Sequence, residues 1–129
     1  MEIVRRAYEA FLGGQWHQVA QLHDPDVELH GTVGGLSEGS VARGFQQIRQ
    51  EYQQEDSEAW DERRLEAEEF IDAGDRVVVL LHEFRRGRGS GVELEADTAV
   101  VVEVRNGLVV RLQGYMHRAE ALQAAGLGE

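Results

Sequence analysis

The stretch of residues 68–117 constrains the fold most, because it reads as strands separated by three short turn signals. Runs rich in Val, Leu, Ile and Phe flank each signal, and turns rich in Gly and Asn between such runs are typical of β-hairpins. The stretch therefore predicts four successive antiparallel strands that form one curved sheet. The three signals are Ala73-Gly74-Asp75, Arg88-Gly89-Ser90-Gly91 and Arg105-Asn106-Gly107.

The residues before this stretch predict helices. Apolar residues recur at helical spacing from Ile3 to Phe11 and stop at Gly13, which favours an amphipathic helix with a glycine end. In chain order, the other expected elements are a helix over residues 16–22, a short strand over 27–30, a glycine-rich loop over 31–40, a helix over 44–55, a long strand over 60–72 and a closing helix over 118–125. This order predicts one α+β domain over residues 1–129, with three N-terminal helices packed on a curved, mostly antiparallel sheet and a short C-terminal helix.

Composition excludes several classes of function. The formal net charge of −11 disfavours binding to nucleic acid, which needs a basic face. All 13 basic residues are Arg and there is no Cys, so neither a Lys Schiff base nor a thiol nucleophile is available. Residues 1–12 carry several charges and resemble neither a signal peptide nor a membrane span, so we expect a cytoplasmic protein that needs no cofactor.

Alternation along residues 93–105 predicts which side chains face the helices. The even-numbered residues from Leu94 to Val104 are almost all apolar and should face inward. The odd-numbered set should face outward, where Ala99 and Val101 would leave an apolar centre ringed by charge. Such a face is typical of a dimer interface, and we expect a homodimer through it. On this outer face His82 should lie opposite Asp97, either as an acid–imidazole pair with a function or as an ordinary cross-strand pair.

With these elements assigned, the chain resembles the SnoaL-like polyketide cyclase family, within the nuclear transport factor 2-like superfamily of cone-shaped α+β domains. The resemblance covers nearly the whole chain and implies a small-molecule pocket between the sheet and the helices, but it does not fix a reaction. The segments that carry it are HDPDVELHG at residues 23–31, ARGFQQIRQEY at 42–52, EEFIDAGDRVVVLL at 68–81 and RGRGSGVELEADTAVVVEVRNGLVVRLQGYMHRAEALQAAGL at 86–127.

Two positions depart from the family's pattern. Val100 stands about where relatives place a polar residue, and Gly114 stands where ring-closing or epoxide-hydrolysing relatives place a catalytic Asp. Neither side chain can exchange a proton, so the relatives' mechanisms are disfavoured.

Three other residues are the catalytic candidates. Tyr8 matches the tyrosine that donates a hydrogen bond to an oxyanion in ketosteroid isomerases, or is a core tyrosine. His30 could act as a general base oriented by Glu28; alternatively, His30 caps its strand and Glu28 is solvated.

The candidate ligand-binding residues would form apolar and aromatic walls with one polar group, Thr98. They are Trp16, Phe45, Tyr52, Thr98, Val100, Leu112 and Gly114, with Phe70, Leu94 and Met116 as further candidates for the wall. The five His residues show no metal-ligand spacing, so we expect no metal site.

Three functions remain open. The first is binding of a small hydrophobic ligand, with proton transfer by general acid–base catalysis as in a cyclase or isomerase. The second is a non-catalytic ligand-binding or dimerisation module that has lost the family's catalytic residues. Epoxide hydrolysis ranks third, because it needs an Asp–Arg–Asp arrangement that the expected inward positions do not supply.

Overall fold

The fold is that of a computed structural model, which describes residues 1–35, 37–50 and 60–127. Residues 45–50 are helical, and the remainder of the helix expected over residues 44–55 lies outside the described residues. In chain order the elements are α1 (Glu2–Leu12), α2 (Trp16–Gln21), β1 (His23–Val33), β2 (Val41–Arg43), β3 (Trp60–Asp72), β4 (Arg76–Gly87), β5 (Glu93–Arg105), β6 (Leu108–Tyr115) and α4 (Arg118–Ala124).

One six-stranded sheet joins all the strands, in the order β2-β1-β6-β5-β4-β3. Strands β3 to β6 form the antiparallel meander that the turn signals predicted, and β1 pairs with β6 in parallel. At the last turn Asn106 and Gly107 have φ values of 54° and 77°, as a two-residue hairpin turn requires. The α+β class and the mostly antiparallel sheet are therefore confirmed.

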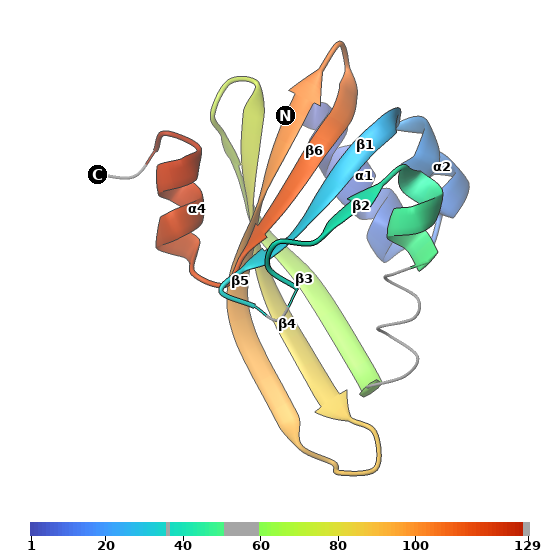
Figure 1. Ribbon diagram of the computed structural model, residues 1–129, viewed down its shortest axis with the longest axis vertical. Coiled ribbons are helices and arrows are strands. Elements are labelled where there is room, and N and C mark those ends of the chain that lie inside the picture. Colours follow the sequence, from blue (N-terminus) through green and yellow to red (C-terminus); the bar gives the residue numbers. More distant parts are fainter. Residues whose placement is uncertain (36, 51–59, 128–129) are drawn as a thin grey trace.

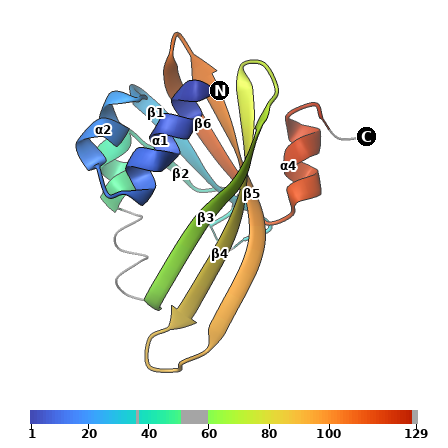
Figure 2. The same cartoon turned by 180° about the vertical axis from the view of Figure 1, so that it is seen from behind.

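Helices cover both faces of the twisted sheet. Figures 1 and 2 show α1 and α2 on one face and α4 on the other. The inner core, under α1, contains Val4, Val79 and Val102. The outer core, under α4, contains Ala99 and Val101. The alternation predicted for residues 93–105 is confirmed from Ala99 to Val104, where even-numbered apolar residues pack in the inner core and odd-numbered ones in the outer core.

Two local expectations were wrong. Strand β1 extends to Val33, so the predicted loop over residues 31–40 begins three residues later, and the three-residue strand β2 was missed. Pairing explains both differences, because β1 has β2 on one side and β6 on the other. The register of β1 shifts between His23 and Glu28, a segment that contains Pro25, which has no N–H to donate.

The apolar centre of the outer face is covered within the chain. Ala99 is 0% exposed and Val101 is 7% exposed, and both pack with Ala121 of α4. The expectation that this centre lies open on the surface was therefore wrong. Among the described residues, no helix has the length and apolar character needed to cross a membrane.

Candidate functional site

Two adjoining cavities lie over the inner face of the sheet, and the N-terminal helices line one of them. The inner chamber, about 210 Å³, lies against α1, α2 and residues 45–49. The outer chamber, about 820 Å³, lies against β1, the turn after it, and the middle of β4, β5 and β6. Five residues line both chambers and mark where they meet: Leu29, Arg63, Leu81, Glu83 and Val100.

Aromatic side chains form one side of the inner chamber. Phe11 meets Tyr8 and Trp16 edge to face, with ring centroids 6.5 and 5.5 Å apart. Phe45 lies 6.0 Å from the His23 ring, and the guanidinium of Arg49 lies 5.1 Å from the centre of the Trp16 ring. Such a wall suits a flat apolar ligand, because aromatic rings favour edge-to-face and offset contacts.

His23 is the only imidazole that lines the inner chamber among the described residues. Its Nδ1–H donates a hydrogen bond to the backbone oxygen of Val19 at 2.6 Å, and burial lowers the pKa of its side chain. Because the carbonyl oxygen can only accept, the proton of a neutral ring is on Nδ1 and Nε2 is left as an acceptor.

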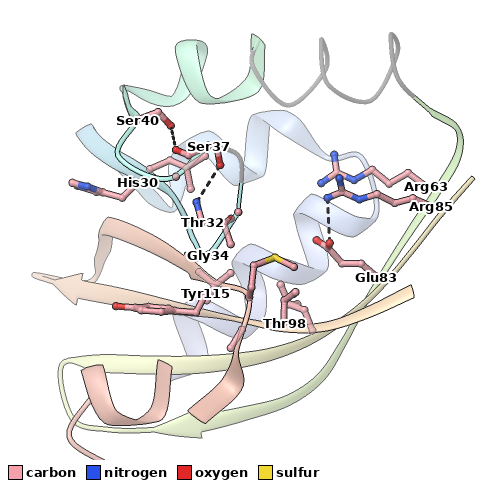
Figure 3. A pocket seen from close by; sticks show the side chains of 18 residues that line it. His30, Thr32, Gly34, Ser37, Ser40, Arg63, Glu83, Arg85, Thr98 and Tyr115 are labelled. Atoms are coloured by element: carbon pink, nitrogen blue, oxygen red, sulfur yellow. Dashed lines mark hydrogen bonds and ion pairs between the residues drawn. The ribbon is translucent and has the colours of Figure 1, made fainter. Parts of the chain in front are cut away.

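Charged groups gather where the chambers meet. Side chains at alternate positions of β4 lie on the inner face, so Glu83 and Arg85 share this face with Val79 and Leu81. An NH2 group of Arg85 donates to Glu83 Oε2 at 3.1 Å, and the two side chains are only 21% and 19% exposed. Arg63 of β3 pairs directly with Arg85, so the two guanidiniums lie side by side above Glu83 in Figure 3.

Tyr8 of α1 lines the inner chamber, and its ring also packs edge to face on Phe70, which is outside the lining, with ring centroids 5.9 Å apart. Burial raises the pKa of the Tyr8 hydroxyl well above its usual value, and the carboxylate of Glu83 raises this pKa further. The phenol therefore stays protonated near neutral pH, and can donate a hydrogen bond to an oxygen that gains negative charge.

Hydroxyl groups line the opposite side of the outer chamber. Thr32, Ser37 and Ser40 lie across the cavity from the two arginines, and Thr98 is buried on its floor (Figure 3). The turn is held by its own hydrogen bonds, since the Thr32 N–H donates to Ser37 Oγ and the Ser40 hydroxyl donates to the Ser37 carbonyl. A Cβ atom at the buried Gly114 would lie 2.7 Å from Thr32 Oγ1. Thr32 thus fills the space that a larger residue at position 114 would need.

The three catalytic candidates do not come together. His30 Nε2 lies 2.9 Å from Glu28 Oε1, and the other carboxylate oxygen of Glu28 lies 2.9 Å from Arg43. His30 borders the outer chamber, but its ring points away from it in Figure 3, because inward positions on β1 belong to Val27 and Leu29. Tyr8 lines the inner chamber, separate from this pair.

The bond to His30 lowers the pKa of Glu28 most strongly, and the charges of Arg43, His30 and Arg111 lower this pKa further. Glu28 is therefore an ionised partner in a surface ion-pair cluster. The prediction that His30 is a base oriented by Glu28 stays a prediction.

The ligand-binding candidates are divided between the chambers. Trp16, Phe45 and Leu112 line the inner one, Thr98 and Gly114 the outer one, and Val100 both. Tyr52 lies outside the described residues. Of the further wall candidates, Met116 lines the outer chamber, but Phe70 and Leu94 line neither. Leu94 is 51% exposed, since the β4–β5 hairpin extends past the helices (Figure 1).

Sequence reasoning missed Arg63, Glu83 and Arg85. Alternation continued from Val77, Val79 and Leu81 would have placed Glu83 and Arg85 on the inner face. Arg63 is harder to place, because the register of β3 against β4 shifts between Ala67 and Glu69. Such a shift reverses the inward and outward positions that alternation from Phe70 would give.

The predicted cross-strand pair of His82 and Asp97 is present on the outer face. The two residues are partners in the β4–β5 register, and His82 Nδ1 lies 2.7 Å from Asp97 Oδ1. Within residues 1–35, 37–50 and 60–127, no three His, Asp or Glu side chains are grouped as metal ligands would be.

Comparisons with known proteins agree with this architecture. The chain is 26% identical to an NTF2-like protein of unknown function from Burkholderia pseudomallei K96243, with a TM-score of 0.75 over 95% of this chain and 94% of that one. TerC, co-crystallized with polyporic acid, is 23% identical, with a TM-score of 0.74 over 97% and 96% of the chains. Rv0760c from Mycobacterium tuberculosis, in complex with estradiol-17beta-hemisuccinate, is 15% identical, with a TM-score of 0.67 over 90% and 92%.

A search of curated proteins found no match. The profile of the SnoaL-like domain matches residues 4–112, which is most of the chain, and the structural neighbours are NTF2-like. The expected resemblance is therefore confirmed, and the chain belongs to the SnoaL-like domain family.

Proposed function

We propose that this protein binds a small apolar molecule in the two chambers and catalyses a proton transfer on it without a cofactor. The observation that carries the proposal is that Tyr8 and Glu83 both line the inner chamber, and that Glu83 is close enough to raise the pKa of Tyr8. An aromatic wall provides the binding energy, and a neutral donor next to a carboxylate provides the chemistry.

The proposed step is the ionisation of a carbon acid next to a carbonyl group. Glu83 accepts the proton from carbon, the C–H electron pair forms a new C=C bond, and the carbonyl π electrons move to oxygen. The Tyr8 hydroxyl donates a hydrogen bond to this oxyanion, and Glu83 then returns the proton to carbon. Arg85 holds one oxygen of Glu83, which fixes the direction of the carboxylate.

Two of the solved neighbours support ligand binding in this fold. TerC was crystallized with polyporic acid and Rv0760c with estradiol-17beta-hemisuccinate. We propose by analogy that a ring-containing molecule enters the chambers of this chain.

A second function, non-catalytic ligand binding, is favoured by Val100 and Gly114. Val100 lines both chambers and pairs directly with Gly114, so the two positions contribute only apolar surface. A protein that binds the ligand but never exchanges its protons fits this alternative.

The experiment uses 2-tetralone, a bicyclic ketone with acidic C–H bonds next to its carbonyl. Binding is followed by the fluorescence of Trp16, which lines the inner chamber, with Trp16→Phe as the control for the other tryptophan. Proton transfer is followed in D₂O as enzyme-dependent incorporation of deuterium, by mass spectrometry. Binding with exchange supports the enzyme, and binding without exchange supports the alternative. Absence of binding by this ketone and by a panel of steroid-like and polyketide-like ligands would contradict both.

The homodimer and the cytoplasmic location stay part of the proposal. Because α4 already covers Ala99 and Val101, a dimer through the outer face has to include α4 or the sheet beside it. Light scattering at micromolar concentration measures the oligomeric state, and a monomer there would exclude this dimer.

A further inference from the structure

Among the described residues that line the two chambers, arginines outnumber carboxylates, which is the reverse of the balance in the whole sequence. The sequence has 24 acidic residues against 13 arginines. Among the described residues that line the chambers, the charged side chains are three arginines, Arg49, Arg63 and Arg85, and one carboxylate, Glu83. A cavity that gathers the less common charge of its protein is suited to an anion, because the field of the lining acts at close range there.

Two of these arginines face each other directly. Arg63 and Arg85 are register partners on neighbouring antiparallel strands, so their side chains share the inner face. Like charges directly opposite each other destabilise a strand pair. Glu83 lies two residues from Arg85 on the same face and holds one of its NH2 groups at 3.1 Å.

We propose that the cavity takes an organic monoanion, with its apolar ring system in the inner chamber and its carboxylate held by Arg63 and Arg85. The inference rests on the proposed function, because it names the class of ligand for the same cavity. A guanidinium offers several N–H donors in one plane, so one that holds a protein carboxylate can also donate to a ligand carboxylate.

The surroundings fit this division of the ligand. Arg63 lines both chambers, so a carboxylate beside it lies at the junction, next to the aromatic wall that would hold the rings. Across the outer chamber, the hydroxyl groups of Thr32 and Thr98 can donate to oxygen. Arg63, Arg85 and Glu83 together carry two positive formal charges and one negative one, a balance that one anionic group on the ligand would neutralise.

The test compares two probes of equal shape, naphthalene-2-carboxylate and naphthalene-2-carboxamide. Affinity is measured by isothermal titration calorimetry at pH 7 and low salt for the wild type, Arg63→Gln, Arg85→Gln and Arg111→Gln. Arg111 is exposed on β6, so its variant removes the same charge away from the cavity. Circular dichroism and melting curves check that each variant is folded.

The wild type is expected to bind the carboxylate about 10-fold more tightly than the amide, since charge-assisted hydrogen bonds are the stronger ones. This preference should fall to about 2-fold in Arg63→Gln or Arg85→Gln and persist in Arg111→Gln. Equal wild-type affinities for the two probes overturn the inference and leave the proposed function intact. A preference that survives in both cavity variants also overturns it. If neither probe binds, the inference is also overturned. The 2-tetralone experiment then tests the proposed function separately.

Discussion

The two faces of the sheet carry different kinds of polar chemistry. On the outer face, Glu28–His30 and His82–Asp97 are acid–imidazole pairs between close partners in sequence or register. By contrast, Arg63 and Glu83 of the inner face and Tyr8 of α1 come from three different elements and line one chamber. The proposed site therefore rests on the face of the sheet on which the side chains lie, and not on pairs of side chains.

The largest expected effect is a difference in exchange activity between a variant on the inner face and a variant on the outer face. Glu83→Gln keeps the size of the side chain but removes its ability to accept a proton, so deuterium exchange into 2-tetralone should fall by about 100-fold or more. His30→Ala should leave the exchange rate within about 2-fold, because its ring is turned away from the outer chamber. Both rates are measured by mass spectrometry under the same conditions.

The opposite ranking of these two variants would return the catalytic role to His30 and Glu28. In that case Glu28→Gln should also slow exchange, because its bond to His30 orients the ring. Melting curves of all three variants show whether a loss of rate is a loss of folded protein.

A second prediction concerns the rigidity of the turn after β1, which lines the outer chamber. A Cβ atom at Gly31 would lie 1.7 Å from the backbone oxygen of Ser37, so Gly31→Ala has to displace the turn. We expect it to lower the free energy of unfolding by about 1–3 kcal/mol. Gly35→Ala is the matched control, since its Cβ would lie 3.3 Å from the nearest atom, the Thr32 oxygen. Urea denaturation measures both, and equal stabilities would show that the turn gives way easily.

The smallest expected effect is the pH dependence of the outer face. The bond to Asp97 raises the pKa of His82, and the bond to His82 lowers the pKa of Asp97. The His82 contribution is fully present below its unfolded pKa of 6.5 and is lost as pH rises through its higher folded value. The Asp97 contribution is present above its unfolded pKa of 3.8 and is lost as pH falls through its lower folded value.

The pair should therefore stabilise the fold most between about pH 3.8 and pH 6.5. The measurement is the difference in melting temperature between the wild type and His82→Gln across this range and above it. A difference that is the same at every pH would show that the pair does not titrate with folding. Because both side chains are solvent-accessible, we expect the difference to be small.

Much of the fold is readable from the sequence because its signals are local. The hairpin turns, the alternation of residues 93–105 and the glycine end of the first helix each depend on neighbouring residues, and all three are present. The pairing of His82 with Asp97 also follows from counting outward from one turn.

The remaining features depend on contacts between distant residues. The register shift in β3 decides where Arg63 points, and it arises from pairing with β4 rather than from a local motif. The closing helix itself was expected, but its position over Ala99 and Val101 was not, since its apolar residues could pack on several surfaces. The pocket itself was expected from the family resemblance. The cluster of Arg63, Glu83 and Arg85 was not, because its members are brought together by pairing between strands.

The parallel pairing of β1 with β6 also has a consequence for the order in which the protein can form. Strand β1 begins at His23 and its partner β6 ends at Tyr115, so β1 and β2 can join the meander only after β6 has been synthesised. Until then the hairpins of β3, β4 and β5 can form by themselves, whereas β1 has only the short β2 beside it. Pairings this distant along the chain are slow to form. The outer chamber is lined by residues of β1, β4 and β6 together, so it is complete only after β6 has paired with β1.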